Sequence, residues 1–137
     1  MIVYKRKYKR EMKAYSIVQK SDLKSRKRAK YINVKFERCE DGEAYFSVPS
    51  NSYRGKVHIV LITSPQIKKD ITLSQLKGIV HHDDIKIACS CEAFLYQGYK
   101  YFSYISGAGV DKETRKPKSY KSGLACKHII AVLDELI

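Results

Sequence analysis

The sequence has 137 residues, which is the length of one domain with a modest hydrophobic core. Hydrophobic residues make up 44% of it, as in a globular protein, and its formal net charge is +13. No stretch is long and apolar enough to cross a membrane, and the first ten residues lack the apolar core of a signal peptide. We therefore expect a cytoplasmic protein with no membrane partner.

The first 30 residues predict a basic arm that precedes the folded domain. Residues 1–38 carry 14 Lys and Arg against three acidic residues, so +11 of the net charge lies there. Some apolar residues recur at about a helical turn, but so charged a stretch is more often irregular on its own. Such charge attracts polyanions, although it also suits a solubilising tail. The candidate nucleic-acid contacts are Lys5, Arg6, Lys7, Lys9, Arg10, Arg26, Lys27, Arg28 and Lys30.

From residue 31 the pattern becomes that of an antiparallel sheet. Residues 32–37 alternate between apolar and polar, EDGE at 40–43 contains an Asp-Gly turn, and 44–48 return as the partner strand. A third strand is predicted over 56–63. A fourth is predicted by the alternation within 85–89.

Two helices are predicted beside these strands. One covers 73–80, with Thr72 as its N-cap. The other lies in CKHIIAVLDELI (126–137), whose apolar residues share one face at helical spacing. The segment that follows the fourth strand begins aromatic and ends polar, and we expect its latter half to be a loop.

Two short pairs of potential metal ligands stand out, Cys89 with Cys91 and Cys126 with His128. A reducing compartment disfavours disulfides, and cysteines at i and i+2 on an extended segment would bridge only with strain. On a strand both thiolates face one side and can reach one ion, whereas on a helix such positions are about 200° apart. We therefore expect Cys126 just before the C-terminal helix and His128 in its first turn, with Gly123 easing the entry.

The order Cys-x-Cys, Cys-x-His and hydrophobic helix resembles the SWIM zinc finger. Acidic and aromatic residues after Cys91 and the run CKHII at 126–130 agree with that family. The resemblance covers about the last 50 residues and implies a structural Zn²⁺ bound by Cys89, Cys91, Cys126 and His128. The separation of 34 residues between the pairs is long for the family, so the insert is an elaboration. Its FLYQGYKY segment resembles SWIM-type proteins of large tailed bacteriophages.

The expected fold class is α+β. A small antiparallel sheet, from residues 31–63 and 84–90, is joined by a zinc knuckle to the C-terminal helix. The expected organisation is a basic N-terminal arm over 1–30 and a single zinc-stabilised SWIM-like domain over 31–137.

Several aromatic and titratable residues have alternative interpretations. The tyrosines after the first ligand pair are placed either to stack on bases or to form an interface, or else to pack around the zinc; they are Tyr96, Tyr99, Tyr101 and Tyr104. We expect Cys39 to be an incidental thiol and His58 a hydrogen-bonded structural histidine. His81 and His82, followed by two aspartates, predict a solvated turn rather than a second metal or acid–base cluster.

Two functional hypotheses follow, and neither is enzymatic, because no nucleophile–base pair, phosphate-cradling loop or open metal position is present. The first is a SWIM module that binds DNA or RNA through the basic arm. The second is a structural or assembly protein of a phage virion or other large complex, which would place it in a viral particle within the host cytoplasm. Phosphate binding should weaken steeply with salt, whereas a Tyr- and Ile-anchored protein interface should resist it.

Overall fold

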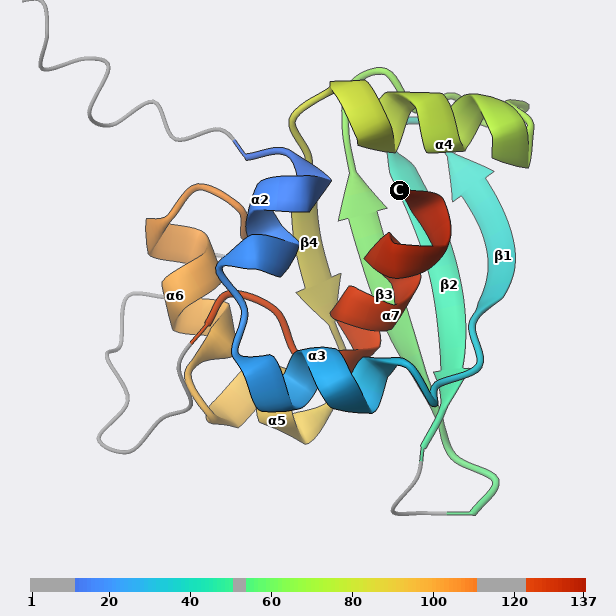
Figure 1. Cartoon of the computed structure of the whole chain (residues 1–137). Coiled ribbons are helices and arrows are strands. Elements are labelled where there is room, and N and C mark those ends of the chain that lie inside the picture. The colour runs from blue at the N-terminus through green and yellow to red at the C-terminus, as the bar shows by residue number, and fades with distance from the viewer. Residues whose placement is uncertain (1–11, 51–53, 111–122) are drawn as a thin grey trace, which may run out of the picture.

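The computed structural model describes residues 12–50, 54–110 and 123–137. Its centre is a four-stranded antiparallel sheet in the order β1-β2-β3-β4, with helices gathered over one face (Figure 1). The strands are β1 (Lys35–Glu40), β2 (Glu43–Pro49), β3 (Val57–Thr63) and β4 (Lys86–Cys89). The expected α+β fold with a small antiparallel sheet is confirmed.

The hairpin between β1 and β2 follows from its turn chemistry. Glu40 pairs with Glu43, so Asp41 and Gly42 form the turn, and Gly42 has a φ of 85° that glycine adopts without strain. Along β2 every second side chain is buried, and the buried ones are Ala44, Phe46 and Val48. This alternation fixes which face of the sheet meets the helices.

Helix α4 (Leu73–His82) begins at the predicted N-cap. Thr72 Oγ1 accepts a hydrogen bond of 3.1 Å from the Gln75 backbone N–H, and Gln75 Oε1 accepts one of 2.8 Å from the Thr72 backbone N–H. This reciprocal pair is a capping box, which satisfies two of the free donors at a helix start.

The C-terminal helix α7 (Lys127–Leu136) provides much of the core. Its buried residues are His128, Ile129, Ile130, Ala131, Val132, Leu133 and Leu136. A helix that is buried on most of its circumference needs partners on several sides. Helix α7 has them, because it contacts β3, β4 and three other helices.

The structure differs from the expected arm over residues 12–30. These residues form α2 (Ala14–Gln19) and α3 (Leu23–Ala29), and both helices contact α7. Their buried side chains are Ala14, Ile17, Ser21, Ser25 and Ala29. The spacing is helical, but most of these residues are small, so the buried stripe is hidden among basic residues in the sequence. The predicted boundary after residue 30 therefore falls inside the packed unit.

A short hydrogen-bond network anchors α3 to the segment that follows the first ligand pair. The Tyr99 hydroxyl donates to Asp22 Oδ1 (3.0 Å), and the Ser25 backbone N–H donates to Asp22 Oδ2 (3.0 Å). Burial alone would raise the pKa of Asp22, but the hydrogen bonds from Ser25 and Tyr99 outweigh it and hold the pKa below its ordinary value of 3.8. The network therefore favours the ionised carboxylate.

We expect Asp22→Ala to lower the free energy of unfolding at pH 7 by about 1–2 kcal/mol, because α3 loses its N-cap and Tyr99 its acceptor. A depressed pKa contributes stability above the pKa of the unfolded chain, and that stability disappears as the pH falls through the folded value. The deficit of the variant should therefore shrink below about pH 4. Urea unfolding of the wild type and the variant from pH 3 to 7 measures this difference in stability, and Asp70→Ala, at an exposed position, is the control. A deficit independent of pH would contradict the role given to the charge.

The segment after β4 adds two helices that the sequence patterns did not predict. They are α5 (Glu92–Tyr96) and α6 (Tyr99–Ile105). After α6 the chain returns to the sheet, where Ile87 donates to Ala108 and Val110 donates to Ile87. The expected loop in the latter half of the insert falls largely on residues 111–122, outside the described residues.

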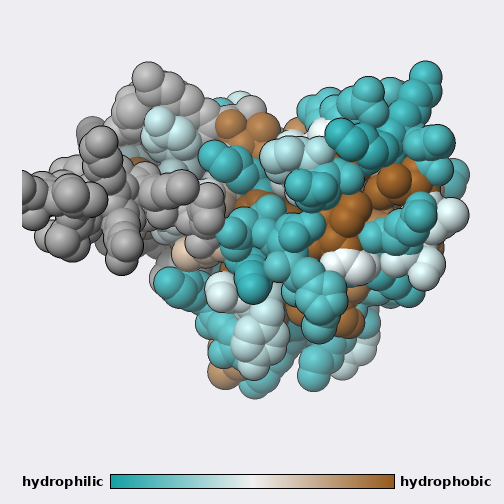
Figure 2. Space-filling model, turned by 90° about the horizontal axis from the view of Figure 1, so that it is seen from above, coloured by the Kyte–Doolittle hydropathy of each residue, from teal (hydrophilic) through white to brown (hydrophobic). Residues whose placement is uncertain are grey.

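Figure 2 looks onto the end of the sheet that carries α4. Hydrophilic side chains cover most of this face, and apolar side chains lie exposed between them. Among the described residues, no helix combines the length and apolarity needed to cross a membrane.

Candidate metal centre

Three elements converge on the two predicted ligand pairs. Cys89 is the last residue of β4, and Cys91 is the N-cap of α5. Cys126 is the N-cap of α7, and His128 lies in the first turn of that helix. The placement of the second pair matches the expectation from helical geometry, and Gly123 enters it with a φ of 109°.

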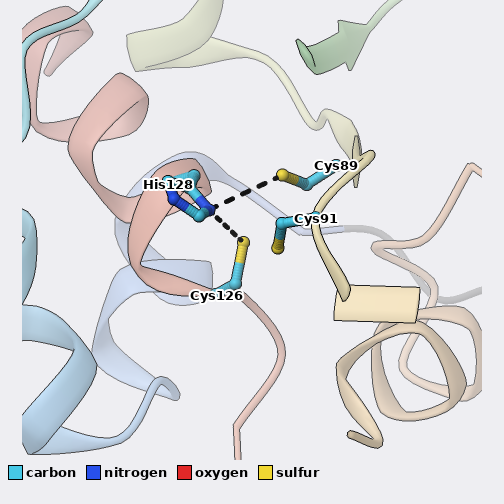
Figure 3. A group of neighbouring side chains, drawn as sticks. All are labelled: Cys89, Cys91, Cys126 and His128. Carbon is cyan, nitrogen blue, oxygen red and sulfur yellow. Dashed lines mark hydrogen bonds between the residues drawn. The ribbon is translucent and has the colours of Figure 1, made fainter. Parts of the chain in front are cut away.

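The four side chains point toward a common centre (Figure 3). His128 Nδ1 lies 4.0 Å from Cys89 Sγ and 3.9 Å from Cys126 Sγ, and all four ligand atoms lie within 4.8 Å of one another. A tetrahedral zinc with bonds of about 2.0–2.3 Å places its ligand atoms about 3.5–3.8 Å apart. Only a slight contraction separates the observed cluster from that geometry.

The ligand cluster is buried, and its thiols perturb one another. Burial raises the pKa of Cys126, whereas hydrogen bonds from Cys126 and Cys89 lower the pKa of Cys91. A hydrogen bond with Cys126 lowers the pKa of Cys89, but contact with Cys91 and burial together raise it above its usual value. Three ionised thiolates in this volume need a cation between them.

The local backbone also favours negative charge at this point. The Phe94 backbone N–H donates to Cys91 Sγ at 3.3 Å, which stabilises the thiolate form. Cys126 stands at the positive N-terminal end of the ten-residue helix α7. Three sulfur ligands and one imidazole form a donor set that suits Zn²⁺.

Residues 66–101 and 118–137 match the family model of the SWIM zinc finger. The chain contains a SWIM zinc finger. The matched segments include both ligand pairs, and residues 102–117, within the long insert, lie outside them. A search of curated proteins and a search of solved structures each found no match. The SWIM finger and its zinc-binding character are thus supported by the family match together with the Cys/His cluster.

His58 lies beside the SWIM ligands, although its sequence context gave no sign of this. Its ring centroid is 4.8 Å from that of His128, and its buried Nδ1 has no hydrogen-bond partner among the described residues. Burial, followed by the charge of His128, lowers the pKa of His58. The expectation of a hydrogen-bonded histidine is therefore wrong for Nδ1. The position of His58 beside the ligands follows from strand pairing. Val60 pairs with Cys89, and His58 lies two residues before Val60 on the same face of the strand.

The predicted stacking tyrosines separate into different environments. Tyr99 is 1% exposed and hydrogen-bonded to Asp22, so its assignment as a stacking or interface residue is wrong. Tyr96 is 74% exposed, while Tyr101 and Tyr104 are half-buried. Only Tyr96 presents most of its surface to solvent.

The predicted basic contacts are described only in part. Lys27, Arg28 and Lys30 are exposed on or just after α3, and Arg26 is half-buried there. Lys5, Arg6, Lys7, Lys9 and Arg10 lie outside the described residues.

The remaining candidates do not join the SWIM site. His81 and His82 are exposed at the end of α4, and among the described residues the ligand cluster is the one group that could hold a metal. Cys39 is a buried thiol in β1, and burial raises its pKa. It is therefore a poor nucleophile.

Proposed function

We propose that this protein is a non-enzymatic SWIM zinc module that binds nucleic acid. The observation that carries the proposal is the exposed cationic surface of α3 beside the metal centre. Helix α3 contacts α7, the helix that provides His128, so the metal holds the cations in place through the core. Nucleic acid is the partner that such a surface attracts through counterion release.

The zinc of this module is structural. Four protein ligands complete a tetrahedron, which leaves no position for a reactive water. Binding energy at a site that joins β4, α5 and α7 becomes folding energy for the whole unit. Its role is therefore to hold these elements together.

The test is binding to labelled single- and double-stranded DNA and RNA over a salt series, with zinc content quantified. We expect the dissociation constant to rise steeply with salt. Lys27→Gln combined with Lys30→Gln should make the slope of log K against log[salt] shallower by roughly 1.5. Lys69→Gln combined with Lys77→Gln removes the same charge from the region of α4 and serves as control.

Zinc-loaded protein that binds none of these nucleic acids at low salt would contradict the proposal. The basic surface would then serve a protein partner, as expected of an assembly component of a virion or another large complex. Salt-resistant binding to such a partner would support that second role.

A further inference from the structure

Two hollows adjoin over the SWIM metal centre. One has a volume of about 180 Å³ and lies between α3, α5 and the start of α7. The other, of about 200 Å³, lies between β3, α5 and the start of α7. Both are lined by Ala93, Gln97, Lys127 and His128, so they lie next to each other on either side of these shared residues. We call the two neighbouring hollows together the knuckle groove.

The knuckle groove carries positive charge along its length. Arg28 lines the first hollow, Lys56 the second, and Lys127 both. Glu92 is the single acidic side chain among the described lining residues. Three cations spread over two neighbouring hollows suit a chain of phosphates better than one isolated anion.

Two exposed tyrosines lie close in sequence to residues that line the groove. Tyr96 immediately precedes the lining residue Gln97 and is 74% exposed. Tyr31, two residues after the end of α3, is 87% exposed. A ring with a free face is the group on which an unpaired base stacks.

We propose that the knuckle groove binds a single strand of nucleic acid. Arg28, Lys56 and Lys127 contact successive phosphates, and Tyr31 and Tyr96 stack on unpaired bases. This inference rests on the proposed nucleic-acid function and specifies its site and substrate class. A duplex keeps its bases stacked on one another, so it offers the tyrosines no base face.

The test uses the full-length, zinc-loaded chain with labelled oligo-dT, oligo-rU and a mixed-sequence duplex. In the groove variant Arg28, Lys56 and Lys127 are each replaced by Gln. Its salt slope for the single strands should be shallower than that of the wild type by about 2, since each phosphate contact on a single strand contributes about 0.7. Replacing Lys69, Lys77 and Lys86 by Gln removes equal charge at the end of the sheet near α4, away from α3 and α5 (Figure 1).

A second pair of variants tests stacking. Tyr31→Leu and Tyr96→Leu should each weaken single-strand binding about tenfold and leave duplex binding unchanged. Tyr45→Leu, on the face of the sheet away from the helices, is the control. Comparison of oligo-dT with oligo-rU shows whether the strand is DNA or RNA.

The outcomes separate this inference from the proposed function. Absence of binding by the wild type overturns both. Wild-type binding with a steep salt slope that the groove and control variants share overturns the groove alone. Equal affinity for duplex and single strand, unaffected by the tyrosine variants, overturns the single-strand assignment. If Lys127→Gln lowers zinc content, the Arg28→Gln and Lys56→Gln pair replaces the triple variant, with an expected change of about 1.4.

Discussion

Replacing Cys126 by Ser should abolish stoichiometric zinc binding and unfold much of the domain. A serine hydroxyl does not replace a thiolate on zinc, and the two remaining thiols would stay buried beside His128 without a cation. Metal binding contributes on the order of 10 kcal/mol in small zinc modules, comparable to the whole stability of an ordinary domain. Metal analysis and thermal melting measure the effect.

Two controls sharpen this test. Cys39→Ser changes a buried thiol outside the ligand cluster, so zinc should remain stoichiometric. A chelator should reproduce the loss in the wild type, and added Zn²⁺ but not Mg²⁺ should reverse it. If Cys126→Ser had the melting temperature and metal content of the wild type, the assignment of this cluster as a metal centre would be wrong.

The second large effect is expected from Ile17→Ala in helix α2. Ile17 is fully buried in the common core, so its truncation leaves a cavity and should cost about 2–4 kcal/mol of unfolding free energy. Tyr15→Ala on the exposed side of the same helix should have little effect. Urea unfolding compares the two variants.

This comparison decides where the folded domain begins. A loss confined to Ile17→Ala shows that residues 12–30 belong to the cooperative unit. Equal stability of the two variants would instead show that these residues form an arm outside the core.

The sequence was most informative where local chemistry determines structure. Gly42 is needed for the hairpin turn, and Thr72 with Gln75 forms the capping box whose N-cap was predicted. The ligand pairs were predictable because i and i+2 share a side on an extended segment but not within a helix. These features depend on residues only a few positions apart.

The features missed in the sequence depend on distant partners. The buried face of helix α3 consists of Ser25 and Ala29, and such small residues are not recognised as a hydrophobic pattern in the sequence. Tyr99 looked available for stacking because its partner, Asp22, is 77 residues away. His58 reaches the metal centre through the pairing of β3 with β4, a register that neither strand specifies alone.

The contact between α3 and α7 also sets the order in which parts of the domain can fold during synthesis. Residues 126–128 are synthesised after both Cys89 and helices α2 and α3, so the SWIM ligands cannot close around a metal before that point. The sheet hairpins can form before this point, because their contacts are close along the chain. Helix α3 docks on α7, whose arrival closes a loop of about a hundred residues. Zinc availability once residue 128 has been synthesised should therefore govern the yield of folded protein.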